Sequence, residues 1–405
     1  MEMRQIRGLE IARQKQVKPT ENGWFVKSQS GAGSYRVDEL FNCNCPDSQK
    51  RQATCKHAFA VRYFLQVEKE TATGVQVEKV RITYKQAWKA YDAAQTQEIK
   101  LFDELLKDLV QGIDEPAQAF GRPRLSLRET AFCSIQKVYS QLSCRRAVSL
   151  FGNAVERQQI THKPHFSATS RLLNRPEITP ILHELIRVTA APLIGVETDF
   201  AVDSSGFRTT CFGAYAEQKY ALNRDHKFIK AHAIVGVKTN IITGVEVLEG
   251  NSADCPQLPV LVEKTANGGF TVKELSADKA YNSADNYNAV AAIGGQAYIP
   301  FKENATGQSH GLKYRLWRKA FHYFQLNSQE FYEHYHKRSN IETTFGAVKK
   351  KFGDTLKSKN PKAQENELLC KLIAYNITVL IHEMHELGIK PDFSSQSPAG
   401  VANVA

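Results

Sequence analysis

The order of strand-like and helix-like segments after Leu193 is the feature that most constrains the fold. Four segments near its start have the composition of strands: LIGVETDFAVDSSG, FRTTCFGAYAE, KFIKAHAIVGV and IITGVEVLEG. Strand-like TVKELSAD and AYIPF then alternate with helix-like DCPQLPVLVEKTAN and SADNYNAVAAIG. Two more helices are expected around 329–352 and 363–387. This succession predicts an α/β fold with a mixed sheet flanked by helices.

The rest of the chain divides into regions of different character. Residues 1–70 hold short strand-like runs and a cysteine cluster, and residues 80–190 have mainly helical spacing. The α/β domain is expected at 191–388, with a basic insertion near 302–328. Residues 389–405 are rich in Ser, Pro and Gly and are expected to be a loose tail.

Charge is the compositional feature that bears on function. The 405 residues carry a formal net charge of +11. Such a basic excess favours polyanionic partners, of which nucleic acid is the commonest, although a protein that is merely basic remains the alternative. No apolar run is long enough for a membrane helix, and the charged first residues are unlike a secretory signal. Five of the eight cysteines are scattered singly, which favours a reducing, cytoplasmic location.

Four potential metal ligands lie within fifteen residues near the N-terminus. Cys43, Cys45, Cys55 and His57 have the spacing C-x-C-x9-C-x-H. Three thiolates and one imidazole suit a tetrahedral structural zinc ion, whereas unrelated thiols are the alternative. The spacing resembles the SWIM zinc finger at all four ligand positions. That resemblance implies a role in binding DNA or protein.

A second constellation lies on the predicted helix YHKRSNIETTFGAVKKKFG. At about 100° per residue, Arg338, Glu342 and Lys349 fall within about 60° of Tyr335. An apolar stripe lies beside this polar ridge, formed by Ile341, Phe345, Val348 and Phe352. The helix can therefore pack on a core and hold a carboxylate between basic groups at its edge. The alternative is a solvated face of an amphipathic helix.

The spacing Tyr-x2-Arg-x3-Glu-x6-Lys is also the YREK signature, and the sequence resembles the DDE transposases of bacterial insertion sequences from about Leu193 to His385. The family's first aspartate ends an early strand, as Asp203 is expected to do in FAVDSSG. Its second follows a later strand and precedes a tyrosine, as Asp278 does in LSADKAY. The resemblance thus implies a triad of Asp203, Asp278 and Glu342.

Two other aspartates compete for these roles. Asp199 lies four residues before Asp203 and would face the same side of a strand. Asp203 is preferred because the strand is expected to end there. Asp254 follows a turn and is interpreted as a helix N-cap.

The resemblance implies a ribonuclease-H-like catalytic domain and two Mg²⁺ or Mn²⁺ ions per active site. Asp203 would bridge both ions, while Asp278 and Glu342 would each bind one. Hard oxygen ligands suit these ions, and a pair of ions can activate water and stabilise a leaving oxygen. The implied reaction is water attack at a transposon end, followed by attack of the freed 3′-hydroxyl on target DNA. The implied assembly is a homodimer on paired DNA ends, associated with the nucleoid.

Further DNA contacts are expected outside the triad. Tyr335, Arg338 and Lys349 would contact phosphates beside the scissile bond. Trp317, in the basic insertion, could stack on an unpaired base, although a packed helix is favoured by its spacing to Phe321 and Phe324. Arg122 in GRPR could enter a minor groove, or belong to an ordinary turn.

The region 80–190 is expected to bind DNA ends, either through a helix-turn-helix or as a plain bundle. His232, in a Lys-x-His segment with Lys230, is interpreted as a hydrogen-bonded histidine of the sheet rather than a group near the metals. For the whole chain, an active transposase is the favoured function. The alternatives are a non-catalytic DNA-binding protein on the same scaffold and a metal-dependent nuclease that does not join DNA.

Overall fold

A computed structural model describes residues 3–14, 16–20, 23–29, 33–51, 54–72, 87–118, 120–121, 124–209, 228–307 and 309–393. The chain separates into two compact units. One comprises Met1–Val80 with Thr306–Phe331, and the other comprises Arg81–Ala305 with Tyr332–Ala405. Arg122 and most of the predicted strand FRTTCFGAYAE lie outside the described residues. Among the residues described, none of the helices combines the length and apolar character needed to span a bilayer.

The N-terminal unit contains a small antiparallel sheet in the order β1 (Val17–Thr20), β2 (Gly23–Lys27), β3 (Ser34–Val37). Three helices accompany it: α1 (Met3–Arg13), α2 (Pro46–Arg51) and α3 (Lys56–Ala72). Val26, Val37 and Val61 are among the side chains that form its buried core. Helix α1 was not predicted. Helix α2 occupies the spacer between the cysteine pairs.

The same unit includes the predicted basic insertion. It forms a 3₁₀ turn η3 (Leu312–Tyr314) and helix α12 (Arg315–Leu326). Helix α13 (Ser328–Tyr335) follows directly and leads out of the unit. The aromatic residues spaced along the insertion therefore lie on a helix, as predicted.

The second unit is built on a five-stranded mixed sheet in the order β6-β5-β4-β7-β8. Its strands are β4 (Asp199–Arg208), β5 (Phe228–Gly236), β6 (Ile242–Glu249), β7 (Glu274–Ala277) and β8 (Gln296–Tyr298). Strand β4 pairs antiparallel with β5 and parallel with β7, so it lies at the centre. The short strand β7 is almost wholly buried, as a central parallel strand should be.

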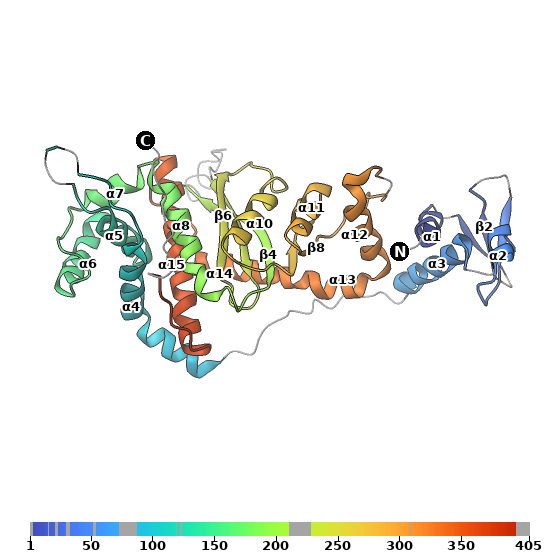
Figure 1. The fold of residues 1–405 in the computed structure, drawn as a ribbon, viewed down its shortest axis with the longest axis horizontal. Coiled ribbons are helices and arrows are strands. Elements are labelled where there is room, and N and C mark those ends of the chain that lie inside the picture. The colour runs from blue at the N-terminus through green and yellow to red at the C-terminus, as the bar shows by residue number, and fades with distance from the viewer. Residues whose placement is uncertain are drawn as a thin grey trace, which may run out of the picture. The chain divides into compact units, whose positions relative to one another are not determined.

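Helices surround this sheet, as Figure 1 shows. They include α8 (Ile178–Ala190), α10 (Gln257–Asn267), α11 (Ala284–Ala292), α14 (Ser339–Phe352) and α15 (Pro361–Glu386). Helix α15 is buried along most of its length and packs against α4, α5, α8 and β6. The mixed sheet flanked by helices confirms the predicted ribonuclease-H-like fold.

The helical region before the sheet consists of α4 (Trp88–Gln111), α5 (Leu127–Tyr139), α6 (Cys144–Glu156) and α7 (Ser167–Leu173), followed by α8. Helix α5 is buried at nine consecutive positions, Thr130–Val138, so it forms the centre of this bundle. The first three helices lie in the segments YKQAWKAYDAAQTQEIKLFDELLKDLVQ, LRETAFCSIQKVYSQL and CRRAVSLFGNAV, where helices were expected. Helices α7 and α8 were not predicted.

Candidate active site

Two of the three candidate carboxylates come from adjacent parallel strands. Val202 of β4 is in register with Ala277 of β7, and each is followed at once by an aspartate. Asp203 and Asp278 therefore lie side by side at the same level of the sheet. The backbone amide of Ser204 donates to Asp203 Oδ1 at 2.8 Å, and that of Lys279 donates to Asp278 Oδ1 at 2.6 Å.

The third carboxylate, Glu342, lies in the first turn of α14 and reaches the strand carboxylates through Arg338. The Arg338 guanidinium is 2.5 Å from Asp203 Oδ2 and 2.7 Å from Glu342 Oε1. The Arg338 side chain is only 19% exposed, whereas that of Glu342 is 59% exposed. The three carboxylates thus come from two strands and one helix, with one guanidinium ion-paired to two of them.

The electrostatics of Asp203 reflect this gathering of acids. Burial raises the pKa of Asp203, and the ion pair with Arg338 opposes the rise. The negative charges of Asp278 and Glu342 raise this pKa further. Their influence indicates that the three carboxylates share one electrostatic environment in which a cation is favoured.

The premise that β4 ends at Asp203 is wrong. The strand continues to Arg208, because its pairing with β5 runs on for five residues past Asp203. What ends at this level is the partner strand β7, at Ala277. At the level of Asp203 the neighbouring strand β7 has therefore ended, and the Asp203 side chain is not covered by it.

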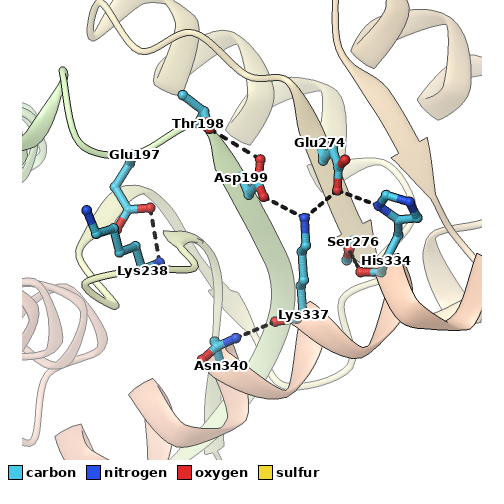
Figure 2. A network of polar contacts seen from close by, with 9 residues as sticks. All are labelled: Glu197, Thr198, Asp199, Lys238, Glu274, Ser276, His334, Lys337 and Asn340. Atoms are coloured by element: carbon cyan, nitrogen blue, oxygen red, sulfur yellow. Dashed lines mark hydrogen bonds and ion pairs between the residues drawn. The ribbon is translucent and has the colours of Figure 1, made fainter. Parts of the chain in front are cut away.

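Asp199, the competing aspartate, has a different partner. Lys337 Nζ is 2.6 Å from Asp199 Oδ2 and 2.6 Å from Glu274 Oε2. These two acids face each other across the parallel strands β4 and β7. His334 Nδ1 lies 2.8 Å from the same Glu274 oxygen, and these three polar contacts are among those drawn in Figure 2. We call Lys337, Asp199 and Glu274 the lysine anchor.

The lysine anchor fixes the backbone that precedes Glu342. Lys337 lies in a 3₁₀ turn, η4 (His336–Arg338), between α13 and α14. The Asn340 side-chain amide donates to the Lys337 carbonyl at 2.9 Å, which ties the turn to the start of α14. Lys337 thus fixes the turn to β4 and β7 at the level of Asp199 and Glu274. The next residue, Arg338, fixes the turn to β4 at the level of Asp203.

Replacing Lys337 with methionine should therefore misplace Arg338 and Glu342 without removing either. We expect DNA cleavage to fall by about 10- to 100-fold, because small displacements of catalytic groups have effects of this size. The Mg²⁺ concentration for half-maximal cleavage should rise, and Lys337→Arg should recover much of the activity. A Lys337→Met protein with an unchanged rate and unchanged Mg²⁺ dependence would show that the anchor positions nothing.

A polar cluster lies next to Asp203, around Asp254. The Ser204 hydroxyl donates to Asp254 Oδ1 at 3.0 Å, and Lys230 Nζ lies 2.5 Å from the same oxygen. The interpretation of Asp254 as a helix N-cap is therefore wrong. Its carboxylate is ion-paired with Lys230, and α10 begins only at Gln257.

His232 belongs to the same cluster. Its ring is fully buried and contacts Ser252 Oγ at 3.2 Å and Asp254 Oδ1 at 3.3 Å. Burial lowers the pKa of His232. The histidine of β5 thus has hydrogen-bonding partners, as the sequence suggested, and they lie in the segment that follows β6.

The predicted phosphate-binding ridge is less regular than a single helix, because η4 separates Tyr335 from α14. Burial raises the pKa of the half-buried Tyr335, and the negative charges of Asp278 and Asp203 raise this pKa as well. Lys349 Nζ lies 5.2 Å from the centroid of the Phe207 ring on β4, and burial lowers its pKa. Tyr335 and Arg338 are therefore close to the carboxylates, while Lys349 lies farther along β4.

Trp317 lies on α12 in the N-terminal unit. Its ring stacks on that of Phe321, with centroids 5.8 Å apart, and Phe321 is buried. These contacts agree with the packed helix that its spacing favoured.

The four N-terminal metal ligands converge. The backbone of Cys43 forms an isolated β-bridge with Val37 at the end of β3. Cys45 precedes α2, and Cys55 precedes α3, whose first turn contains His57. Their ligand atoms all lie within 4.8 Å of one another, and all four side chains are buried. His57 Nδ1 is 3.8 Å from Cys43 Sγ and 3.9 Å from Cys55 Sγ. These cysteines form no disulfide, so the set is a candidate metal site.

Comparison with known proteins agrees with the fold. Residues 195–377 match the family model described as the transposase DDE domain. The match begins just before β4 and ends within α15, so it contains Asp203, Asp278 and Glu342. No curated protein matches the chain. The match supports a DDE transposase domain in this part of the chain.

Proposed function

We propose that this protein cleaves DNA at the ends of a transposable element and joins those ends to target DNA, with Asp203, Asp278 and Glu342 as the catalytic triad. The observation that carries the proposal is the convergence of these residues: two aspartates in register on parallel strands and a glutamate linked to the first through Arg338. The alternatives of a metal-dependent nuclease and a non-catalytic DNA-binding protein are outcomes of the test below.

The donor set fits two Mg²⁺ or Mn²⁺ ions, because carboxylate oxygens are the ligands these ions prefer and open positions remain for phosphate and water. In this proposal Asp203 would be a ligand of both ions, and Asp278 and Glu342 would each be a ligand of one. When bound, the ions supply Lewis-acid activation of water and stabilisation of the leaving oxygen. The burial that raises the pKa of Asp203 also strengthens its attraction for a cation.

Arg338 has two roles in this proposal. Its guanidinium neutralises Asp203 and Glu342, at 2.5 and 2.7 Å. These are oxygens that would hold the metal ions. With the ions bound, the Arg338 guanidinium would be free to donate to a DNA phosphate, for which its two-pronged donor geometry is suited.

The decisive experiment incubates the purified full-length protein with Mg²⁺, a target plasmid and duplexes taken from the DNA that flanks its gene. We expect cleaved ends bearing 3′-hydroxyls, and joined products. Cleavage without joining would instead identify a nuclease. Binding with neither product would identify a non-catalytic DNA-binding protein.

Salt titration of DNA-end binding should show different effects for substitutions of Arg338, Glu342 and Lys349. In the presence of Ca²⁺, Arg338→Ala and Lys349→Ala should each reduce the salt dependence by about one phosphate contact. In EDTA the Arg338 effect should shrink, because its guanidinium remains on the carboxylates. Glu342→Gln should abolish cleavage while binding holds or tightens.

Thr343→Ala is the matched control, because Thr343 lies next to Glu342 in α14. Its hydroxyl is hydrogen-bonded to the Ser339 carbonyl at 3.2 Å, so its loss should be mild. If Arg338→Ala and Lys349→Ala both bind with the wild-type salt slope under both conditions, the YREK interpretation of this segment is withdrawn.

The remaining regions have supporting roles in the proposal. Cys43, Cys45, Cys55 and His57 bind one structural zinc ion in a SWIM-type finger, since three thiolates and one imidazole suit tetrahedral zinc. Residues 80–190 bind the element's ends, residues 191–388 form the catalytic domain, and a homodimer brings two ends together. We propose that Trp317 stacks on an unpaired base and that Arg122 enters a minor groove.

A further inference from the structure

Helix α6 has one buried side and one polar side. It buries Ala147, Phe151 and Ala154, which fall on the same side of a helix at about 100° per residue. The opposite side exposes four hydrogen-bonding residues from its first three turns, Arg145, Arg146, Ser149 and Asn153. The helix is therefore fixed by its apolar side, and its polar side, which ends at the exposed Glu156, faces solvent.

The connection from α5 to α6 is short and well defined. Ser140 ends α5, Gln141 has a left-handed backbone with φ of 56°, and the Ser143 side chain accepts from the Arg146 amide to cap α6. Helix α5 is buried and α6 is at the edge of the bundle beside α5 and α7 (Figure 1). A buried helix, a tight turn and an exposed second helix are the arrangement by which helix-turn-helix proteins present a recognition helix.

Cationic side chains flank the polar side of α6. The Arg145 guanidinium lies 4.7 Å from the centroid of the Phe166 ring, in the segment that follows α6. The exposed Lys163 of that segment passes within 4.0 Å of the Cβ position at Gly152. Positive charge thus lies both on the helix and beside it, as a surface needs in order to contact phosphates on the rim of a groove.

We infer that α6 is the recognition helix of this protein: Arg146, Ser149 and Asn153 contact base edges in the major groove of duplex DNA. Arg145 and Lys163 contact the flanking phosphates. Arginine is the common partner of guanine and asparagine of adenine, so these side chains carry base preference that a purely basic face lacks. The inference rests on the proposed function, because it names the surface that selects the element's ends.

The test is selection of a randomised pool of duplexes by the full-length protein without Mg²⁺, followed by affinity measurements on the selected duplex. We expect the wild type to enrich a sequence motif. Arg146→Ala and Asn153→Ala should each weaken binding to the selected duplex by about 5- to 150-fold and relax the motif at different positions. Arg146→Lys keeps the charge but loses the two-pronged contact, so it should lose base preference and retain non-specific affinity.

Two further variants calibrate the result. Lys163→Ala should weaken binding to all duplexes alike and lower the salt slope by about one contact, with the motif unchanged. Lys100→Ala is the matched control, since Lys100 is an exposed basic residue of α4 paired only loosely with Glu104, at 3.9 Å. It should change neither motif nor affinity. Circular dichroism should show that every variant is folded.

The outcomes separate this inference from the proposed function. A wild type that enriches no motif, or folded Arg146→Ala and Asn153→Ala proteins that keep the wild-type motif and affinity, would overturn the inference even if the protein cleaves and joins DNA. A motif that depends on Arg146 and Asn153 supports the inference even if no cleavage follows with Mg²⁺, and in that case only the proposed function fails.

Discussion

Replacing Asp203 with alanine is expected to lower the rate of DNA cleavage by at least about 10³-fold, equivalent to about 4 kcal/mol of transition-state stabilisation. The Asp203 side chain is only 17% exposed, and the negative charges of both other members of the proposed triad raise its pKa. The substitution removes the shared ligand and leaves the DNA-contacting surfaces unchanged. Binding of DNA ends, measured by fluorescence anisotropy, should therefore stay nearly at the wild-type level.

Asp199→Ala is the control for this assignment, because Asp199 lies on the same strand but pairs with Lys337. Its loss weakens the lysine anchor, so a decrease of about tenfold is expected, similar to the smaller effects of misplaced groups. If Asp199→Ala abolishes cleavage while Asp203→Ala remains active, the roles assigned to the two aspartates are wrong.

The second large effect is expected from Cys43→Ser in the N-terminal unit. Loss of one of four ligands should release zinc and unfold residues up to about 70, because a module this small depends on its metal for stability. The second unit has its own core around β4 and α15 and should stay folded. Metal analysis of the carefully reduced wild type should find one zinc per chain, and limited proteolysis of the variant should remove the N-terminal region alone.

Cys133→Ser is the matched control, because Cys133 is a buried cysteine of α5 outside the cluster. It should retain a full equivalent of zinc. Wild-type protein without zinc, or a Cys43→Ser protein that keeps it, would contradict the proposed metal site.

The sequence predicted well those elements whose signal is local. The strand-to-helix alternation gave β5, β6, α10, β7, α11 and β8, because buried strands and amphipathic helices differ in composition and period. Glu342 was placed correctly on a helix, since its apolar stripe is periodic and packs: Ile341, Phe345 and Val348 are all buried. Helix α8 was not predicted. Its Pro180 is compatible with a helix, because it lies in the first turn, where proline is tolerated.

Features that depend on distant residues could not be predicted in the same way. The spacing showed that Asp199 and Asp203 share a face, but not that Lys337, 138 residues later, pairs with Asp199. The extension of β4 past Asp203 depends on pairing with β5, which the local pattern does not reveal. Asp254 resembled an N-cap because it follows a turn, and only the fold brings Lys230 to it. Long-range strand pairing and tertiary ion pairs thus decided the positions where the local interpretation failed.

Consecutive cations in η4 join the helix to two strands: Lys337 bonds to Asp199 and Glu274, and Arg338 bonds to Asp203. A helix start usually frays, and its amide protons exchange with solvent far faster than those of a central sheet. Here the first turn of α14 cannot open without breaking contacts to β4 and β7. The amides that follow Glu342 should therefore share the protection of those strands, and the three carboxylates should lose their arrangement together, in one cooperative step.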